Sequence, residues 1–91
     1  MKFASPLNLI DPASAESFTI AELAREYDVT SRTIRFYEAE GLLAPKREGQ
    51  NRIYSKRDRA RLGWILRGKR VGFSLAEIRD LLDIYRTGGP G

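Results

Sequence analysis

Apolar residues recur at helical spacing from residue 20 onward, and this pattern predicts a first helix over 20–27. The residues that share one face of it are Ile20, Leu23, Ala24 and Tyr27. Thr19 and Glu22 have the spacing of a capping box, in which each side chain bonds the other residue's backbone amide. Phe18 and Leu23 occupy the two positions of a hydrophobic staple, so the start of the helix is well defined.

A second helix is predicted over 31–40. Thr30 supplies a side chain suited to the N-cap, and Gly41 suits the left-handed residue that ends many helices. About three residues separate this helix from the first, and so short a connection forces a large crossing angle. The two helices together predict a helix-turn-helix.

The next segment reads as a β-hairpin. Two short stretches, 43–46 and 52–54, flank the turn-rich sequence EGQN. Gly49 provides the positive φ that a tight hairpin turn requires. A hairpin in this place after a helix-turn-helix is a wing.

Two further helices are predicted over 56–70 and 75–85, the first opened by Ser55 with Asp58 and the second by a capping box from Ser74 to Glu77. The third helix is expected to bury Leu62, Ile65 and Leu66, with Trp64 beside them. The fourth carries the apolar residues Leu75, Ile78, Leu81, Leu82 and Tyr85. The predicted fold is mainly α: a winged helix-turn-helix of four helices with a small β-hairpin wing.

Charge is concentrated in the middle of the chain. Residues 29–70 hold twelve Lys or Arg against four Asp or Glu, a net charge of +8, whereas the flanks together carry −4. Such a distribution indicates a polyanionic partner. Arginine outnumbers lysine twelve to four, which favours bidentate contacts with phosphate or guanine. The chain has neither cysteine nor histidine, so disulfides, thiolate metal sites and the commonest general base are excluded.

The second helix carries the first candidate DNA contacts. At 100° per residue, with Ile34 facing inward, the exposed early positions are Ser31, Arg32 and Arg35. Tyr37 belongs to the buried side, but its hydroxyl is expected to emerge at the edge and donate to a phosphate. The hairpin adds basic and aromatic candidates for the phosphate backbone: Lys46, Arg47, Arg52 and Tyr54.

Between residues 18 and 85 the sequence resembles the DNA-binding half of MerR-family transcription regulators. The resemblance is carried by IRFYEAEGLL, by Pro45, by the R-x-Y of residues 52–54, and by VGFSLAEI after a basic helix. These elements match the family in kind, order and spacing. Within the family, the segment REGQNRIYSKRDRARLGWILRGKRVGFSLAEI is most similar to regulators of leucine, isovalerate and related acyl-CoA catabolism.

The resemblance implies two wings and a set of DNA contacts. Family residues that match Arg32, Arg35 and Tyr37 contact DNA from the recognition helix, those matching Arg47, Arg52 and Tyr54 do so from the first wing, and Lys69 lies near the second. Members bind as homodimers to a pseudo-palindrome in double-stranded promoter DNA. The spacer between the two elements of such a promoter is unusually long. They bend and untwist the promoter so that RNA polymerase engages both of its elements.

The expected organisation is a flexible extension over 1–17, the DNA-binding domain over 18–86 and a flexible tail over 87–91. No cofactor, membrane segment or catalytic constellation is expected, and the protein is predicted to be cytoplasmic and nucleoid-associated. The long dimerisation helix and effector region of the family would follow this stretch, so the chain itself is expected to be monomeric. Two alternatives stay open: an excisionase-like architectural DNA-binding protein, and a protein-interaction or anti-repressor module that docks through its fourth helix.

Overall fold

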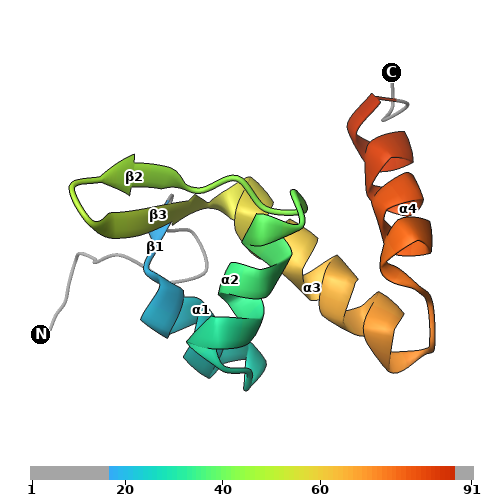
Figure 1. Cartoon of the computed structure of the whole chain (residues 1–91), viewed down its shortest axis with the longest axis horizontal. Helices are drawn as coiled ribbons and strands as arrows, with labels where there is room; N and C mark the ends of the chain where they lie inside the picture. Colours follow the sequence, from blue (N-terminus) through green and yellow to red (C-terminus); the bar gives the residue numbers. More distant parts are fainter. Residues whose placement is uncertain (1–16, 88–91) are drawn as a thin grey trace, which may run out of the picture.

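The computed structural model describes residues 17–87, with side chains to residue 84, and has the winged helix-turn-helix architecture (Figure 1). Within that range it contains four helices: α1 (Ile20–Tyr27), α2 (Ser31–Ala39), α3 (Lys56–Arg70) and α4 (Leu75–Thr87). It also contains three strands: β1 (Ser17–Phe18), β2 (Lys46–Glu48) and β3 (Asn51–Ser55). The mainly helical fold predicted from the sequence is therefore confirmed. None of the helices in this range is long and apolar enough to cross a membrane.

The strands form an antiparallel sheet in the order β1-β3-β2. Arg47 pairs with Arg52 in the hairpin, and Phe18 pairs with Tyr54 on the other side of β3. Gly49 has a φ of +64° and occupies the first position of the two-residue turn between Glu48 and Asn51. Positive φ at that position suits glycine, as in a type II′ turn.

Side-chain caps set the start of each helix, as the sequence predicted. The capping box of α1 is formed: the Thr19 amide donates to Glu22 Oε1 at 2.8 Å, and the Glu22 amide donates to Thr19 Oγ1 at 3.0 Å. The box before α4 is also formed, with the Ser74 amide donating to Glu77 Oε1 at 2.8 Å. Each satisfies amides that have no partner inside the helix.

The core lies where α1, α2 and α3 meet the inner face of β3. Its fully enclosed side chains, all below 2 % exposed, are Tyr54, Leu23, Ile34, Leu42, Leu62 and Ile65. Ile78 and Leu82 extend this core to α4. Because one contiguous core joins all four helices, the surface elements are held in fixed positions relative to one another.

Four sequence expectations need correction. Strand β2 begins at Lys46, not residue 43, because Leu43 is buried and Ala44 donates its amide to Asp58 instead of to a strand. Trp64 is 46 % exposed, so it is not a core residue. Ser17 belongs to β1 and Thr87 to α4, although they were assigned to the extension and the tail. The remaining positions of those two segments, 1–16 and 88–91, lie outside the described residues.

Candidate nucleic-acid interface

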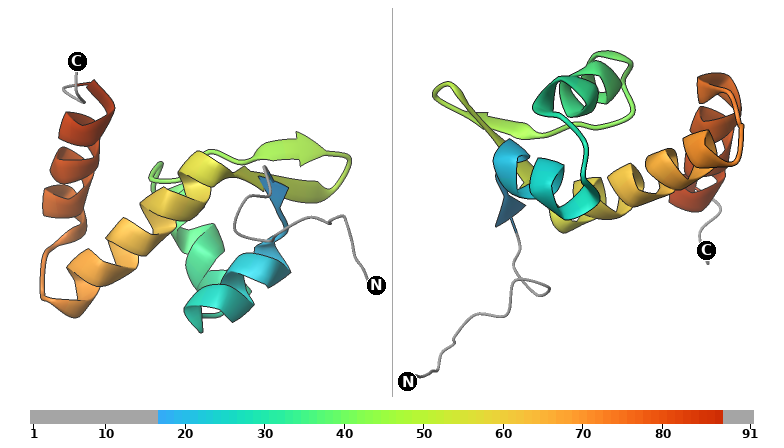
Figure 2. Two further views of the ribbon diagram at one scale, coloured as in Figure 1. Left: turned by 180° about the vertical axis from the view of Figure 1, so that it is seen from behind. Right: turned by 90° about the horizontal axis from the view of Figure 1, so that it is seen from below.

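Helix α2 stands out on one side of the molecule between the β2–β3 wing and α4 (Figure 2). Three residues, Asp28 to Thr30, connect it to α1. Asp28 makes the turn tight because it adopts a left-handed conformation, with φ 56° and ψ 48°, which aspartate tolerates better than most residues. Thr30 then caps α2 by accepting a hydrogen bond from the Thr33 amide at 3.0 Å. This geometry presents the first two turns of α2 to the outside.

Arginines on the outer face of α2 are accessible. Arg32 and Arg35 are exposed, Ser31 is half-buried, and Ile34 points into the core with no exposed surface. Neither arginine forms an ion pair with the described part of the chain. Both guanidinium groups are thus available to an external acceptor, which matches the sequence expectation for the recognition helix. The prediction that they contact DNA remains a prediction.

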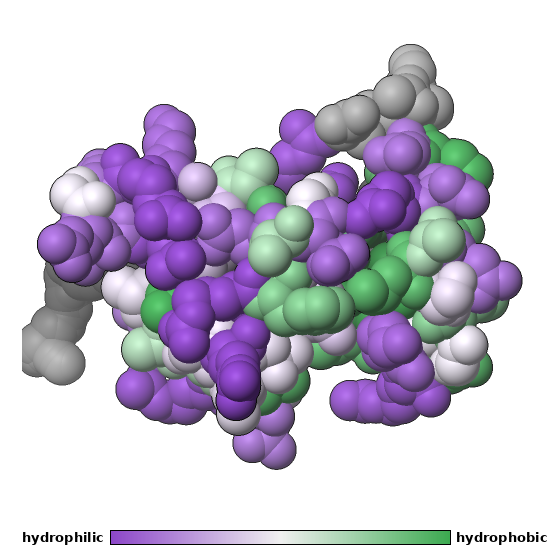
Figure 3. Space-filling model, viewed as in Figure 1, coloured by the Kyte–Doolittle hydropathy of each residue, from purple (hydrophilic) through white to green (hydrophobic). Residues whose placement is uncertain are grey.

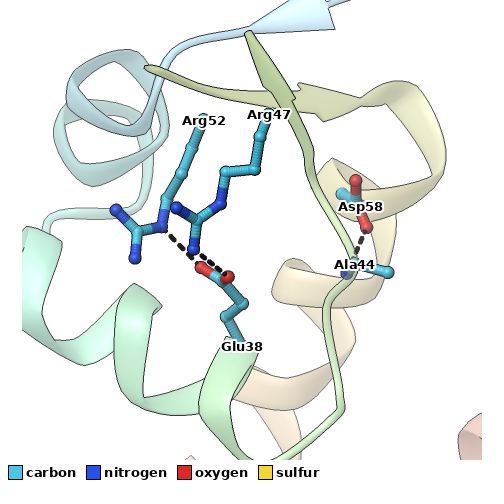
Figure 4. Close-up of polar contacts among 5 residues, drawn as sticks. All are labelled: Glu38, Ala44, Arg47, Arg52 and Asp58. Carbon is cyan, nitrogen blue, oxygen red and sulfur yellow. Dashed lines mark hydrogen bonds and ion pairs between the residues drawn. The ribbon is translucent and has the colours of Figure 1, made fainter. Parts of the chain in front are cut away.

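The wing arginines are held by a carboxylate on α2 (Figure 4). Arg52 Nε donates to Glu38 Oε1 at 2.6 Å, and Arg47 Nη2 donates to Glu38 Oε2 at 3.1 Å. Arg47 remains 54 % exposed and Arg52 25 % exposed. One carboxylate therefore fixes the wing against the recognition helix and places both cations next to it. Sequence reasoning missed Glu38, whose only signal was its position one turn after the inward-facing Ile34.

The pKa of Glu38 reflects this arrangement. Burial alone would raise it, but the hydrogen bonds from Arg52 and Arg47, together with their positive charge, outweigh burial and hold the pKa below its ordinary value. The hydrogen bond to Glu38 likewise raises the pKa of Arg52. The clamp is therefore fully charged at neutral pH.

The two candidate tyrosines lie in the core. Tyr37 is 6 % exposed, and burial raises the pKa of its phenol. Tyr54 has no exposed surface, and its hydroxyl has no hydrogen-bond partner in residues 17–84. Burial, followed by the negative charge of Glu38, raises the pKa of Tyr54. A DNA contact by the Tyr54 side chain is thus not available in this conformation, because strand alternation turns its ring inward from β3.

Asp58 anchors the chain between α2 and the wing. Its carboxylate accepts hydrogen bonds from the Ala44 amide at 3.2 Å, the Ser55 amide at 3.0 Å and Ser55 Oγ at 3.1 Å. It is 6 % exposed, so these bonds compensate for the cost of burying a charge. The segment that enters the wing and the start of α3 are fixed together at this residue.

The far end of α3 carries Lys69, the candidate for the second wing, and it is exposed. Gly72, with a φ of +100°, turns the chain from α3 into α4. Next to this turn, α3 and α4 enclose an apolar groove of about 350 Å³, whose lining includes Trp64, Val71, Phe73, Ile78, Leu81 and Ile84. Figure 3 shows hydrophilic surface over the wing and apolar surface gathered toward α4. The charged and apolar surfaces are thus separated along the molecule.

Comparison with known proteins identifies a family over most of the chain. Residues 18–84 match the family described as MerR HTH family regulatory protein. The HTH-type transcriptional regulator ZntR of Escherichia coli (strain K12) is 41 % identical over 69 residues, which cover 74 % of this chain and 49 % of that protein. The chain spans about half the length of the curated relatives it matches.

Two solved structures share the fold at sequence identities of 30 % and 38 %. One is HiNmlR, a MerR family regulator lacking the sensor domain, bound to promoter DNA; it has a TM-score of 0.70 and 30 % identity, covering 79 % of this chain and 56 % of that one. The other is the transcription regulator PbrR691 from Ralstonia metallidurans CH34 in complex with lead(II). It has a TM-score of 0.70 and 38 % identity, covering 79 % of this chain and 57 % of that one. These matched proteins are described as regulators and not as enzymes.

Proposed function

The chain belongs to the MerR HTH family of regulatory proteins, and from this premise we propose that it binds duplex promoter DNA sequence-specifically and regulates transcription. The observation that carries the proposal is the exposed face of α2, which presents Arg32 and Arg35, on the helix whose Glu38 holds the two wing arginines. A helix of this width and charge fits the major groove, while the wing lies against phosphates. The same family fold is seen on promoter DNA in HiNmlR.

We propose which residues contact bases and which contact phosphates from their exposure and their place in the fold. Arg32 and Arg35, with Ser31 at the start of α2, approach base edges, and Arg47, Arg52 and Lys69 approach the phosphate backbone. Tyr37 is proposed to reach the backbone through its hydroxyl, which donates to a phosphate, although only 6 % of the residue is exposed. The domain proposed to do this is placed at residues 18–86, with Ser17 and Thr87 completing β1 and α4.

We further propose that the complete protein binds as a homodimer to a pseudo-palindromic promoter, distorts it, and so acts on RNA polymerase indirectly from the cytoplasm. Support comes from family membership and from the two-fold symmetry that dimeric regulators share with their operators. An excisionase-like or protein-docking role is not favoured, since a fold relative is described as bound to promoter DNA.

The narrower resemblance to regulators of leucine, isovalerate and acyl-CoA catabolism remains a proposal. PbrR691, at 38 % identity, is described in complex with lead(II), so relatives that share this domain differ in what they bind elsewhere. The two effector classes are distinguished by measuring expression of a reporter gene placed under the cognate promoter. Acyl-CoA precursors are added to one set of cultures and metal salts to another.

The test of DNA binding is a titration of this chain on a randomised duplex pool with sequencing of the bound fraction. We expect enrichment of defined sequences by the wild type and its loss in an Arg32→Ala/Arg35→Ala double variant. Arg25→Ala is a matched control, because it also removes an exposed arginine, but from α1. Equal enrichment by all three proteins would contradict the role given to α2.

A further inference from the structure

Phe36 is an apolar side chain on the outer face of the recognition helix. It is 49 % exposed, although α2 has a core-facing side that already holds Ile34 and Tyr37. At 100° per residue Phe36 lies one helical turn beyond Arg32 and about 40° around the helix from it. It therefore belongs to the same outward surface as Arg32 and Arg35.

The phenyl ring is held in place by its neighbour. Its centroid lies 5.6 Å from that of Tyr37, and the two ring planes are inclined by 60°. This tilted contact lies within the centroid distances at which aromatic rings attract each other, and it favours the observed conformation of Phe36 before any partner binds. Half of the ring still faces outward, so a pre-positioned apolar contact is available at little cost in side-chain entropy.

The surroundings of the ring determine which partner it suits. Arg32 and Arg35 are exposed on the same face, and a purely apolar protein surface would leave their charges desolvated and unpaired. The matching surface must combine an apolar group with negative charge. The major groove of DNA offers such a surface, because each thymine projects a methyl group there between the two phosphate backbones.

We propose that Phe36 is a specificity-determining residue whose ring contacts the methyl group of a thymine and selects a T·A pair at one position of the binding site. This inference rests on the proposed DNA-binding function and adds an apolar readout to the arginine contacts. Burying one methyl group corresponds to about a fourfold preference, so the expected contribution to discrimination is of that order.

The test uses DNA in which the methyl group alone is removed. A binding site is first selected from a randomised duplex pool with the wild-type chain, and each thymine in it is then replaced singly by deoxyuridine. Base pairing and groove hydrogen-bonding groups are unchanged by this replacement. We expect about a fourfold loss of wild-type affinity at one thymine per half-site, and less than about 1.5-fold at the same thymine for Phe36→Ala.

Two further variants make the result specific. Phe36→Leu retains an apolar side chain and is expected to recover part of the deoxyuridine response. Phe73→Ala removes another exposed phenyl ring, 42 % exposed at the α3–α4 turn, and is expected to keep the full response. Circular dichroism of each variant confirms that the helices are formed.

The outcomes separate the inference from the function on which it rests. If sequences are enriched but no thymine responds, or if Phe36→Ala responds as the wild type does, the assignment of Phe36 is overturned and the DNA-binding function stands. If no sequence is enriched at any salt concentration, the proposed function itself fails and the assignment falls with it.

Discussion

At the scale of single residues, Asp58 shows how one buried carboxylate organises the binding surface. It caps α3 through Ser55 and receives the Ala44 amide, so one side chain fixes the segments on both sides of the wing. The sequence predicted its capping role from the Ser55–Asp58 spacing. The contact with Ala44 was not predictable, because it joins residues whose proximity depends on how the chain folds around Leu42 and Leu43.

Replacement of Asp58 by alanine is expected to lower the free energy of unfolding by about 2–4 kcal/mol, because it leaves the Ala44 and Ser55 amides without their charged acceptor. Urea denaturation followed by circular dichroism measures the loss. Glu77→Ala is the matched control: it removes the carboxylate of an exposed capping box before α4, and a loss below about 1 kcal/mol is expected. Equal losses in both variants would show that the buried contact to Ala44 contributes nothing.

Removing an arginine from α2 and removing one from the wing are expected to change DNA binding in different ways. Arg35→Ala should cost about 1–3 kcal/mol on the selected sequence and relax sequence preference, since a base contact is lost. Arg52→Ala should weaken binding to all sequences similarly and reduce the salt slope by about one phosphate. Titrations on selected and scrambled duplexes at several salt concentrations compare them. A change of preference in Arg52→Ala but not in Arg35→Ala would reverse the roles of helix and wing.

At the scale of elements, two contacts determine how neighbouring elements pack. Glu38 ties the wing to the recognition helix, and Gly68 lets α3 and α4 approach each other.

Helix boundaries were predictable because caps and apolar spacing are local. Strand β1 was not predictable, because two residues are too few to show an alternation of apolar and polar side chains. Its pairing also depends on where β3 lies. The exposure of Trp64 was also missed. Helical spacing places Trp64 next to the buried residues of α3, but it does not show on which side of them the core ends.

The clamp at Glu38 predicts a pH dependence of stability. The folded-state pKa of Glu38 is lowered, so its contribution is present above the ordinary pKa of a glutamate and is lost as the pH falls through the lowered folded value. Unfolding free energies measured across acidic pH for the wild type and Glu38→Gln isolate this residue from the other carboxylates. The wild type is expected to be the more stable at neutral pH, with the difference shrinking toward acid. A constant difference across the range would rule out the clamp as its cause.

The α3–α4 contact depends on the absence of a side chain at residue 68. A Cβ there would lie 2.9 Å from Ile78 Cγ1 and 3.0 Å from Cδ1, closer than packing allows. Gly68→Ala is therefore expected to lower the free energy of unfolding by about 1–2 kcal/mol, although alanine is the better helix former. In Gly63→Ala the added Cβ would meet the Tyr27 hydroxyl at 3.0 Å, with the ring carbons at 3.5 Å, and this variant is expected to cost less. Trimming the partner in Gly68→Ala/Ile78→Val removes Cδ1 but keeps Cγ1, so it should restore part of the loss. If it restores none, the clash is not with Ile78 Cδ1.

At the scale of the whole molecule, charged and apolar surfaces occupy different places. Basic residues gather on α2, the wing and the end of α3, whereas exposed apolar side chains gather at the α3–α4 groove. The sequence predicted the basic middle from charge counts alone. It left the apolar face of the fourth helix open to a docking role, but it did not predict a groove between α3 and α4. Only the packed structure shows that Leu81 and Ile84 remain 52 % and 63 % exposed.

The isolated chain is expected to be monomeric at micromolar concentration and to bind DNA weakly and with steep salt dependence. A stable interface buries roughly 1,200–2,000 Å². Within residues 17–84 the large exposed apolar side chains other than Phe36 all line the single groove between α3 and α4. If the three cations proposed to approach the backbone each contact one phosphate, the slope of log K against log salt is about −3. Sedimentation, together with titrations on one and two half-sites, tests both expectations. A stable dimer, or an affinity indifferent to salt, would contradict them.

The order of strands in the sheet has a consequence for solubility. Strand β3 is paired on both sides, so the unpaired backbone groups of the wing belong to β2. All three residues of β2 are charged, Lys46, Arg47 and Glu48, and Pro45 lies just before it. Charges and a preceding proline on a short outer strand discourage another β-strand from adding to it. The side chains that prepare the wing for a polyanion therefore also protect it from edge-to-edge aggregation with other copies.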